Sequence, residues 1–201
     1  MQSQPVVVVL GAGQGSRYKG SRHKLAETLG THSVLTRTVR NAIASGLPVV
    51  VVTTPAFLDE AARWVARRDV VVLGGQNGGV APGGMGDSIA AGVAARPAAP
   101  GWLLLPADMP LVQPQTLLDV AAALGEHAAA YAQYRGRRGH PAGFGAELLS
   151  ELLRLTGEEG ARRILARYPA VGVEVADPGV LLDMDTEQDL ADLRAKLSQE
   201  A

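Results

Sequence analysis

Four short runs of apolar, mostly β-branched residues constrain the fold of this chain more than any other feature. The runs are VVVVL at 6–10, VVVVT at 49–53, VVVL at 70–73 and WLLLP at 102–106. Because these runs are apolar almost throughout, they are typical of strands buried on both faces of a mostly parallel sheet. Helical patterns separate the runs, so the sequence predicts an α/β fold with right-handed crossovers.

Apolar residues spaced by three and four positions mark the helices that we expect between and after these runs. The expected helices cover residues 33–46, 57–68, 114–127, 146–155, 160–168 and 186–197. Weaker strand patterns lie at 128–134 and 171–176, and the basic segment RGRRGHP at 135–141 is typical of a turn. The 201 residues contain no internal repeat and no long linker, so we expect one domain spanning residues 1–201.

Charge and cysteine content exclude several classes of protein. The formal net charge is −1, so no protein-wide positive field favours nucleic acid or a membrane as a partner. The sequence contains no cysteine, which excludes disulfides, thiolate metal sites and cysteine nucleophiles. No apolar stretch reaches the length of a membrane-spanning helix, and the N-terminus lacks the pattern of a secretory signal. We therefore expect a cytoplasmic protein.

The glycine-rich segment LGAGQGSRYKGSRHKL, residues 10–25, follows the first run and lies where open parallel sheets bind ligands. It departs from the dinucleotide-binding fingerprint, because Ser16 stands at the third glycine position after Gly11 and Gly13. It also departs from a Walker A loop, because Ser21 stands where lysine is required. Neither of these two common phosphate-binding motifs describes the loop.

What remains is a glycine-rich turn followed by the cations Arg17, Lys19, Arg22 and Lys24. Bare backbone amides and several fixed cations suit the negative charge of a triphosphate. A strand-to-helix turn with solvated charges is the alternative interpretation.

The chain resembles the molybdenum-cofactor nucleotidyltransferases through five motifs that occur in the order typical of that family. The glycine-rich loop is similar to the family signature L-A-A-G-x-G-x-R-[MF]-G-x-x-K, with Gly11 in place of the first alanine. Four later segments are similar to the family's G-M-G-x-S-[IL], D-M-P, G-H-P and D-[IM]-D-T-P-E-D-L motifs. In this chain they read GGMGDSIAAGV, LLLPADMPLV, RGRRGHPAGF and LLDMDTEQDL. The G-H-P and D-x-D-T segments resemble the cytidylyltransferase branch in particular.

This resemblance implies a single three-layer α/β/α nucleotidyltransferase domain, Rossmann-like, with a mostly parallel sheet. It implies Mg²⁺-dependent transfer of CMP from CTP to the phosphate of molybdopterin cofactor, with release of pyrophosphate. The partners would be CTP or another nucleoside triphosphate, a phosphorylated pterin and a molybdoenzyme as acceptor. A guanylyl- or sugar-phosphate nucleotidyltransferase is one alternative, and a non-catalytic nucleotide- or cofactor-binding protein on the same fold is another.

The residues expected to bind the nucleotide lie in the glycine-rich loop and in the G-M-G segment. They are Leu10, Gly11, Ala12, Gly13, Gly15, Ser16, Arg17, Lys24, Gly84, Gly86 and Ser88. We expect Arg17 and Lys24 to be catalytic, because cations fixed beside the phosphates stabilise the charge that develops during transfer. For the Ser88 hydroxyl we favour a second interpretation, in which it is the N-cap of the helix that follows.

Three aspartates are candidate metal ligands. Asp108 follows a buried strand, where one carboxylate can bridge a hard cation and phosphate oxygens, and we expect it to be catalytic as well. Asp183 and Asp185 are two residues apart and point to the same side if the segment is extended. The alternative is that these two acids stabilise the N-terminus of the last helix, with Thr186 as its cap.

The G-H-P segment is the candidate site for the second substrate. The expected residues are Arg138, Gly139, His140 and Pro141. A purely structural role is the alternative for His140, and we expect no role for His23, His32 or His127.

Overall fold

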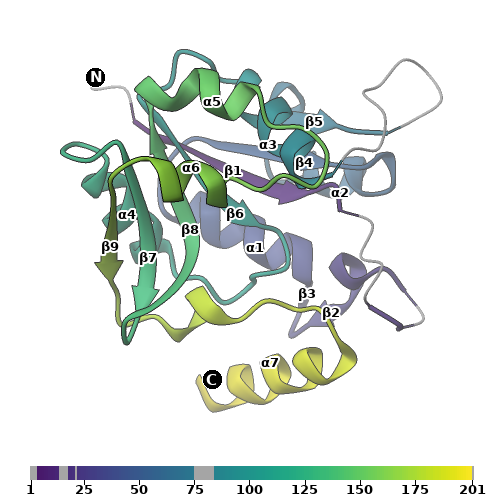
Figure 1. The fold of residues 1–201 in the computed structure, drawn as a ribbon. Helices are drawn as coiled ribbons and strands as arrows, with labels where there is room; N and C mark the ends of the chain where they lie inside the picture. Colours follow the sequence, from purple (N-terminus) through teal and green to yellow (C-terminus); the bar gives the residue numbers. More distant parts are fainter. Residues whose placement is uncertain (1–3, 14–17, 21, 75–83, 201) are drawn as a thin grey trace.

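The computed structural model describes residues 4–13, 18–20, 22–74 and 84–200, and its main element is a seven-stranded sheet with the order β5-β4-β1-β6-β8-β7-β9 (Figure 1). The four apolar runs form its parallel half: β1 (Val6–Gly11), β4 (Val49–Thr53), β5 (Val70–Val72) and β6 (Gly101–Pro106). The mostly parallel α/β sheet expected from the sequence is therefore confirmed.

The other half of the sheet contains β7 (Ala129–Tyr134), β8 (Arg137–Gly145) and β9 (Ala170–Glu174). Within the described sheet, β8 alone runs antiparallel to its neighbours β6 and β7. The prediction of a basic turn over residues 135–141 is therefore wrong in its length, because the observed turn is shorter. The turn consists of Arg135 and Gly136, both with positive φ, and the residues from Arg137 onward pair with β7 as a strand.

Helices cover both faces of the sheet and complete three layers (Figure 1). One apolar cluster contains residues of α1 (Val34–Ala44), α2 (Leu58–Ala61), α4 (Pro114–Ala123) and the C-terminal α7 (Glu187–Glu200). The other contains residues of α3 (Met85–Ala94), α5 (Leu149–Leu153) and α6 (Arg162–Arg167). No helix in the described part of the chain is long and apolar enough to cross a membrane.

Short elements connect these layers. A two-stranded antiparallel hairpin, β2 (Thr28–Leu29) with β3 (His32–Ser33), precedes α1. The single-turn 3₁₀ helices are η1 (Lys24–Ala26), η2 (Pro55–Phe57), η3 (Arg67–Asp69), η4 (Ala146–Leu148) and η5 (Pro178–Leu181).

The continuous apolar character of the strands follows from this double coverage. In β1, Val7 and Val9 belong to one apolar cluster, whereas Val8 and Leu10 belong to the other. A strand with helices on both sides needs apolar residues at every position, since its successive side chains point to opposite faces.

The helix expected over 57–68 is much shorter than its apolar spacing predicts. Only Leu58–Ala61 is α-helical, although turn-like hydrogen bonds continue as far as Val65. The chain has few residues left before Val70, which pairs with Val51 at the start of β5. The pairing of the edge strand therefore takes precedence over the local helical pattern.

The 3₁₀ helix η5 crosses β8 at very close range. A Cβ atom on Gly139 would lie 2.1 Å from the carbonyl oxygen of Val180, and no side chain fits there. This contact holds the segment that leads to Asp183 and Asp185 against the strand that carries His140.

We expect Gly139→Ala to destabilise the protein, because the backbone of η5 must move to make room for the methyl group. The expected loss is roughly 1–3 kcal/mol, or several degrees of melting temperature. Gly160→Ala is the matched control, since a Cβ there meets nothing within 4 Å. Equal melting temperatures for the two variants would contradict the role of this contact.

Candidate active site

The ammonium group of Lys24 lies between two carboxylates that come from distant parts of the chain. Its Nζ donates to Asp108 Oδ2 at 2.5 Å and to Asp185 Oδ1 at 2.8 Å. Lys24 is the first residue of η1, Asp108 lies in the turn after β6, and Asp185 precedes α7. The side chains of all three are largely buried, with exposures of 12%, 17% and 19%.

Backbone contacts place the two carboxylates. The amide of Met184 donates to the carbonyl oxygen of Asp108 at 3.0 Å, and the Met184 side chain is fully buried. Just beyond, the carboxylate of Asp189 accepts from the amides of Asp185 and Thr186, and the Asp189 amide donates to the Thr186 hydroxyl. Thr186 and Asp189 thus cap α7 as a reciprocal pair, and Asp185 is directed towards Lys24.

The electrostatics keep the Lys24 ammonium group charged. Burial alone would lower the pKa of Lys24, but the charge of Asp108 and hydrogen bonds to Asp108 and Asp185 raise it above its ordinary value. Burial similarly opposes ionisation of Asp189, yet the hydrogen bonds from Thr186 and from the amides of Asp185 and Thr186 lower its pKa. Lys24 is therefore a cation at neutral pH.

Two adjoining clefts open beside this cluster. The smaller, about 360 Å³, is lined by residues that include Asp108, Asp183, Asp185, Arg137 and Val180. The larger, about 520 Å³, is mainly apolar and is lined by residues that include Leu10, Ile89, Leu104, Arg162 and Leu165. Both clefts share Met85, Pro106, Arg138, Gly139 and His140, so the G-H-P segment forms part of the boundary between them.

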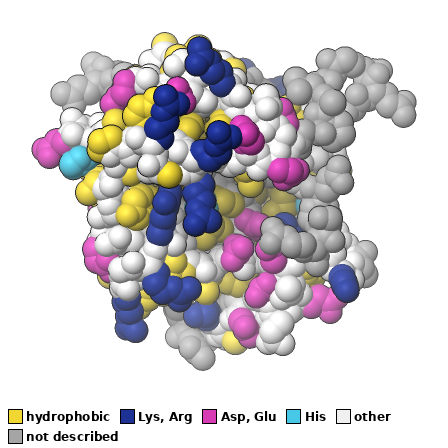
Figure 2. Space-filling model, in the orientation of Figure 1, with side chains coloured by type: hydrophobic (Ala, Val, Ile, Leu, Met, Phe, Trp, Pro, Cys, Tyr) yellow, Lys and Arg dark blue, Asp and Glu magenta, His cyan; other side chains and the backbone are white. Residues whose placement is uncertain are grey.

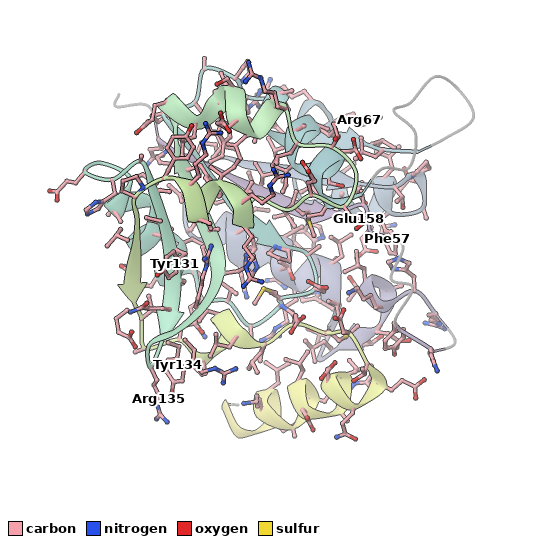
Figure 3. All side chains as sticks on the ribbon, in the orientation of Figure 1. Phe57, Arg67, Tyr131, Tyr134, Arg135 and Glu158 are labelled. Carbon is pink, nitrogen blue, oxygen red and sulfur yellow. The ribbon has the colours of Figure 1, made fainter. Side chains whose placement is uncertain are left out.

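Charge is distributed unevenly over this face of the molecule. Figure 2 shows Lys and Arg side chains gathered in a column over the region of α6 and β8, beside a group of acidic side chains. Arg137, Arg138 and Arg162 are exposed and line the clefts. The Arg138 guanidinium lies 4.6 Å from the centre of the Tyr131 ring, on β7 beside β8 (Figure 3). This stacking holds Arg138 in place without neutralising its charge.

His140 is neutral at neutral pH. Burial lowers its pKa below the ordinary value, in spite of the opposing charge of Asp108 and a hydrogen bond to the backbone of Leu104. Its Nδ1 is buried and has no hydrogen-bond partner among the described residues. The peptide bond from His140 to Pro141, which is buried, is cis.

The chemistry of the aspartates fits a divalent cation. Asp108 and Asp185 already converge on one positive charge, and Asp183 lines the same cleft. Mg²⁺ binds through one or two carboxylates together with substrate phosphate oxygens, so a complete cage of protein ligands is not needed. Among the described residues, no group of three or more His, Cys, Asp or Glu side chains is arranged to hold a metal ion, so the three candidate aspartates do not form a complete metal site by themselves.

The start of the glycine-rich loop lies at the same edge of the sheet. Gly11 ends β1, opposite Thr53 of β4, and Ala12 is buried just beyond it. The carbonyl oxygen of Gly13 contacts the ring of His23. The expected nucleotide-binding residues Gly15, Ser16 and Arg17 lie outside the described residues, and their roles stay predictions.

Gly84 and Gly86 allow the N-terminus of α3 to approach another backbone. A Cβ on Gly84 would lie 2.2 Å from Gly157, and one on Gly86 would lie 2.7 Å from the amide nitrogen of Thr156. The carboxylate of Asp87 accepts from the amides of both Gly84 and Gly157. The prediction that Ser88 is the N-cap of this helix is wrong, because α3 begins earlier, with Gly84 as its N-cap. The Ser88 hydroxyl instead donates to the Gly84 carbonyl oxygen.

Three residues that matter at this site were not predicted from the sequence. Arg162 lines the larger cleft, Asp87 fastens α3 to the 156–159 loop, and His23 contacts the glycine-rich loop. Only the position of His23 directly before Lys24 could have drawn attention to it. Arg162 and Asp87 act across long separations in the chain, which local patterns do not reveal.

Removing the Lys24 ammonium should make the protein responsive to Mg²⁺. In Lys24→Met, Asp108 and Asp185 would face each other without a cation, so a divalent cation between them relieves their repulsion. We expect Mg²⁺ to raise the melting temperature of this variant more than that of the wild-type protein. Lys19→Met, at an exposed lysine, is the control. A melting temperature of Lys24→Met that does not respond to Mg²⁺ would show that the carboxylate pair does not bind the cation.

Comparison with known proteins identifies the fold and the family of the chain. The sequence profile described as "MobA-like NTP transferase domain" matches residues 7–171. A homologue of Mycobacterium tuberculosis Rv0371c from Mycobacterium sp. strain JC1 has a similar structure, with a TM-score of 0.83, 24% identity and 100% of both chains covered. Rv0371c from M. tuberculosis H37Rv, solved in complex with manganese, gives a TM-score of 0.77 and 26% identity, covering 96% of this chain and 99% of that one.

A third similar structure is that of a protein named for its part in cofactor biosynthesis. It is molybdopterin-guanine dinucleotide biosynthesis protein A from Archaeoglobus fulgidus, with a TM-score of 0.71, 18% identity and 97% and 99% coverage. At that identity the likeness shows the fold alone. No curated protein sequence matches the chain significantly. The profile match covers most of the chain and agrees with the nucleotidyltransferase fold, so this chain belongs to the family of MobA-like NTP transferase domains.

Proposed function

We propose that the chain acts as one domain that transfers CMP from CTP to the phosphate of molybdopterin cofactor and releases pyrophosphate. The observation that carries this proposal is the Lys24–Asp108–Asp185 cluster beside a cleft lined by Arg138 and His140. A nucleotide substrate follows from membership of the NTP transferase family. The pterin and the cytosine base rest on the sequence motifs, with a molybdoenzyme as the eventual acceptor.

On the nucleotide side, the protein positions and neutralises the triphosphate. Lys24 and the backbone of the loop beginning at Gly11 lie at the carboxyl edge of the sheet, where ligands of open α/β folds bind. In-line attack on the α-phosphorus places additional charge on the departing pyrophosphate, and a fixed ammonium group stabilises that charge. We propose that Arg17 adds a second cation.

Asp108 and Asp185, with Asp183 nearby, would hold Mg²⁺. When bound, the cation withdraws charge from the phosphate oxygens and allows carboxylates to face a triphosphate without repulsion. Divalent-metal use is supported by the manganese complex of Rv0371c. Other contacts of the chain position these carboxylates. Lys24 binds both of them, and the hydrogen bond from the Met184 amide to the Asp108 carbonyl oxygen keeps the two segments next to each other.

On the second-substrate side, the larger cleft suits a flat heterocycle with an anionic group. Its apolar walls include Leu10, Ile89 and Leu104, and its cations are Arg138 and Arg162. Arg138 lines both clefts, so a phosphate that it binds lies close to the aspartate cluster. That placement brings the nucleophilic phosphate towards the triphosphate, and holding two reactants together supplies much of the catalysis.

Pyrophosphate release distinguishes the candidate reactions. We expect release from CTP in the presence of molybdopterin cofactor, with little release from GTP, from pterin-free mixtures or from sugar phosphates. A clear preference for GTP would replace the cytidylyl assignment by a guanylyl one. Tight nucleotide binding without any release would favour a non-catalytic carrier of the nucleotide or cofactor.

We expect Asp108→Asn to fold normally and to lose at least about two orders of magnitude in turnover, about 3 kcal/mol of barrier. The amide no longer carries the charge that binds the cation and orders Lys24. Melting temperature and pyrophosphate release would be measured on the same preparation. Asp59→Asn, at an exposed aspartate, is the control. Near-normal turnover of a folded Asp108→Asn protein would assign the cation to other residues.

A further inference from the structure

His23 uses both of its ring nitrogens between the glycine-rich turn and Lys24. Its Nε2 lies 3.2 Å from the carbonyl oxygen of Gly13, and its Nδ1 accepts from the amide of Leu25, also at 3.2 Å. One neutral form of the ring satisfies both contacts, with the proton on Nε2 as donor and Nδ1 as acceptor. The Nδ1 contact also caps η1, the short helix that begins with Lys24.

The ring of His23 is anchored to the core. It meets the ring of Phe57 edge-on, with 5.0 Å between the ring centres, and Phe57 is buried at the end of η2 (labelled in Figure 3). Leu25, whose amide His23 caps, is also buried. Burial lowers the pKa of His23, and the charge of Lys24 lowers it further against the opposing hydrogen bond to Gly13. The neutral form required by both contacts is therefore favoured.

We propose that His23 is a positioning residue for nucleotidyl transfer, joining Gly13 to Leu25 and thereby fixing the backbone of Lys24 relative to Gly13. The proposal rests on the proposed function, in which Lys24 faces the triphosphate. Lys24 is therefore held at its backbone and at its side chain. His23 accepts from the amide of the next residue, Leu25, and Asp108 and Asp185 accept from the Lys24 ammonium group. A site ordered beforehand loses less conformational entropy when the nucleotide binds.

Two substitutions separate the polar contacts of His23 from its packing. His23→Phe keeps a ring against Phe57 but removes both polar contacts. His23→Gln keeps a donor that can reach Gly13, so it is the conservative variant. His127→Gln is the matched control, because His127 is exposed and its side chain makes no hydrogen bond, ion pair or ring contact with the described residues.

Binding of CTP and of GTP, each with Mg²⁺, would be measured by calorimetry together with the melting temperature of the nucleotide-free protein. We expect His23→Phe to weaken binding of the preferred nucleotide at least about tenfold, as expected for two lost hydrogen bonds. His23→Gln should recover part of this loss, and His127→Gln should bind as the wild type does. In turnover, the KM for the nucleotide should rise while the KM for the second substrate stays unchanged.

Unchanged nucleotide affinity in His23→Phe would overturn the proposal, and a lower melting temperature beside it would assign His23 a structural role. Wild-type protein that binds a nucleotide but releases no pyrophosphate would overturn the transfer reaction alone, because the affinity comparison does not depend on turnover. Wild-type protein that binds neither nucleotide would overturn both.

Discussion

The ion pairs of Lys24 join three parts of the chain that lie far apart in the sequence, and the candidate active site depends on these ion pairs. Asp108 is 84 residues from Lys24, and Asp185 is 161 residues from it. Two carboxylates so close together repel each other, and a largely buried charge needs a partner, so neither acid is stable there without a cation. The ammonium of Lys24 allows the β6 turn, the segment before α7 and the end of the glycine-rich loop to meet.

Much of the fold could be predicted from the sequence because the responsible signals are local. The four apolar runs became strands with nearly the expected bounds, since each of them is covered on both faces. The errors occur where distant contacts outweigh local pattern. The helix after Phe57 stops early because β5 must pair with β4, and the residues from Arg137 to Pro141 form a strand because β7 lies beside them.

The candidate site was predictable to the level of residue types but not of contacts. Lys24, Asp108 and Asp185 each stood out in a motif, yet no pattern in the chain indicates that the lysine would bind both acids. The same holds for His140 and Arg162, which line one cleft although they lie on a strand and a helix of different layers. His23 received no role because a lone histidine carries no spacing signal, and its importance appears only through Gly13 and Leu25.

The reversed direction of β8 has a consequence for how such a protein can change. Its first residues, Arg137 and Arg138, line the clefts, and a tight two-residue connection, Arg135–Gly136, precedes them. A longer or differently charged connection changes the surface next to Arg137 and Arg138, while the buried half of β8 near Phe144 is untouched. This tip can therefore change in length and charge while the seven-stranded sheet stays the same.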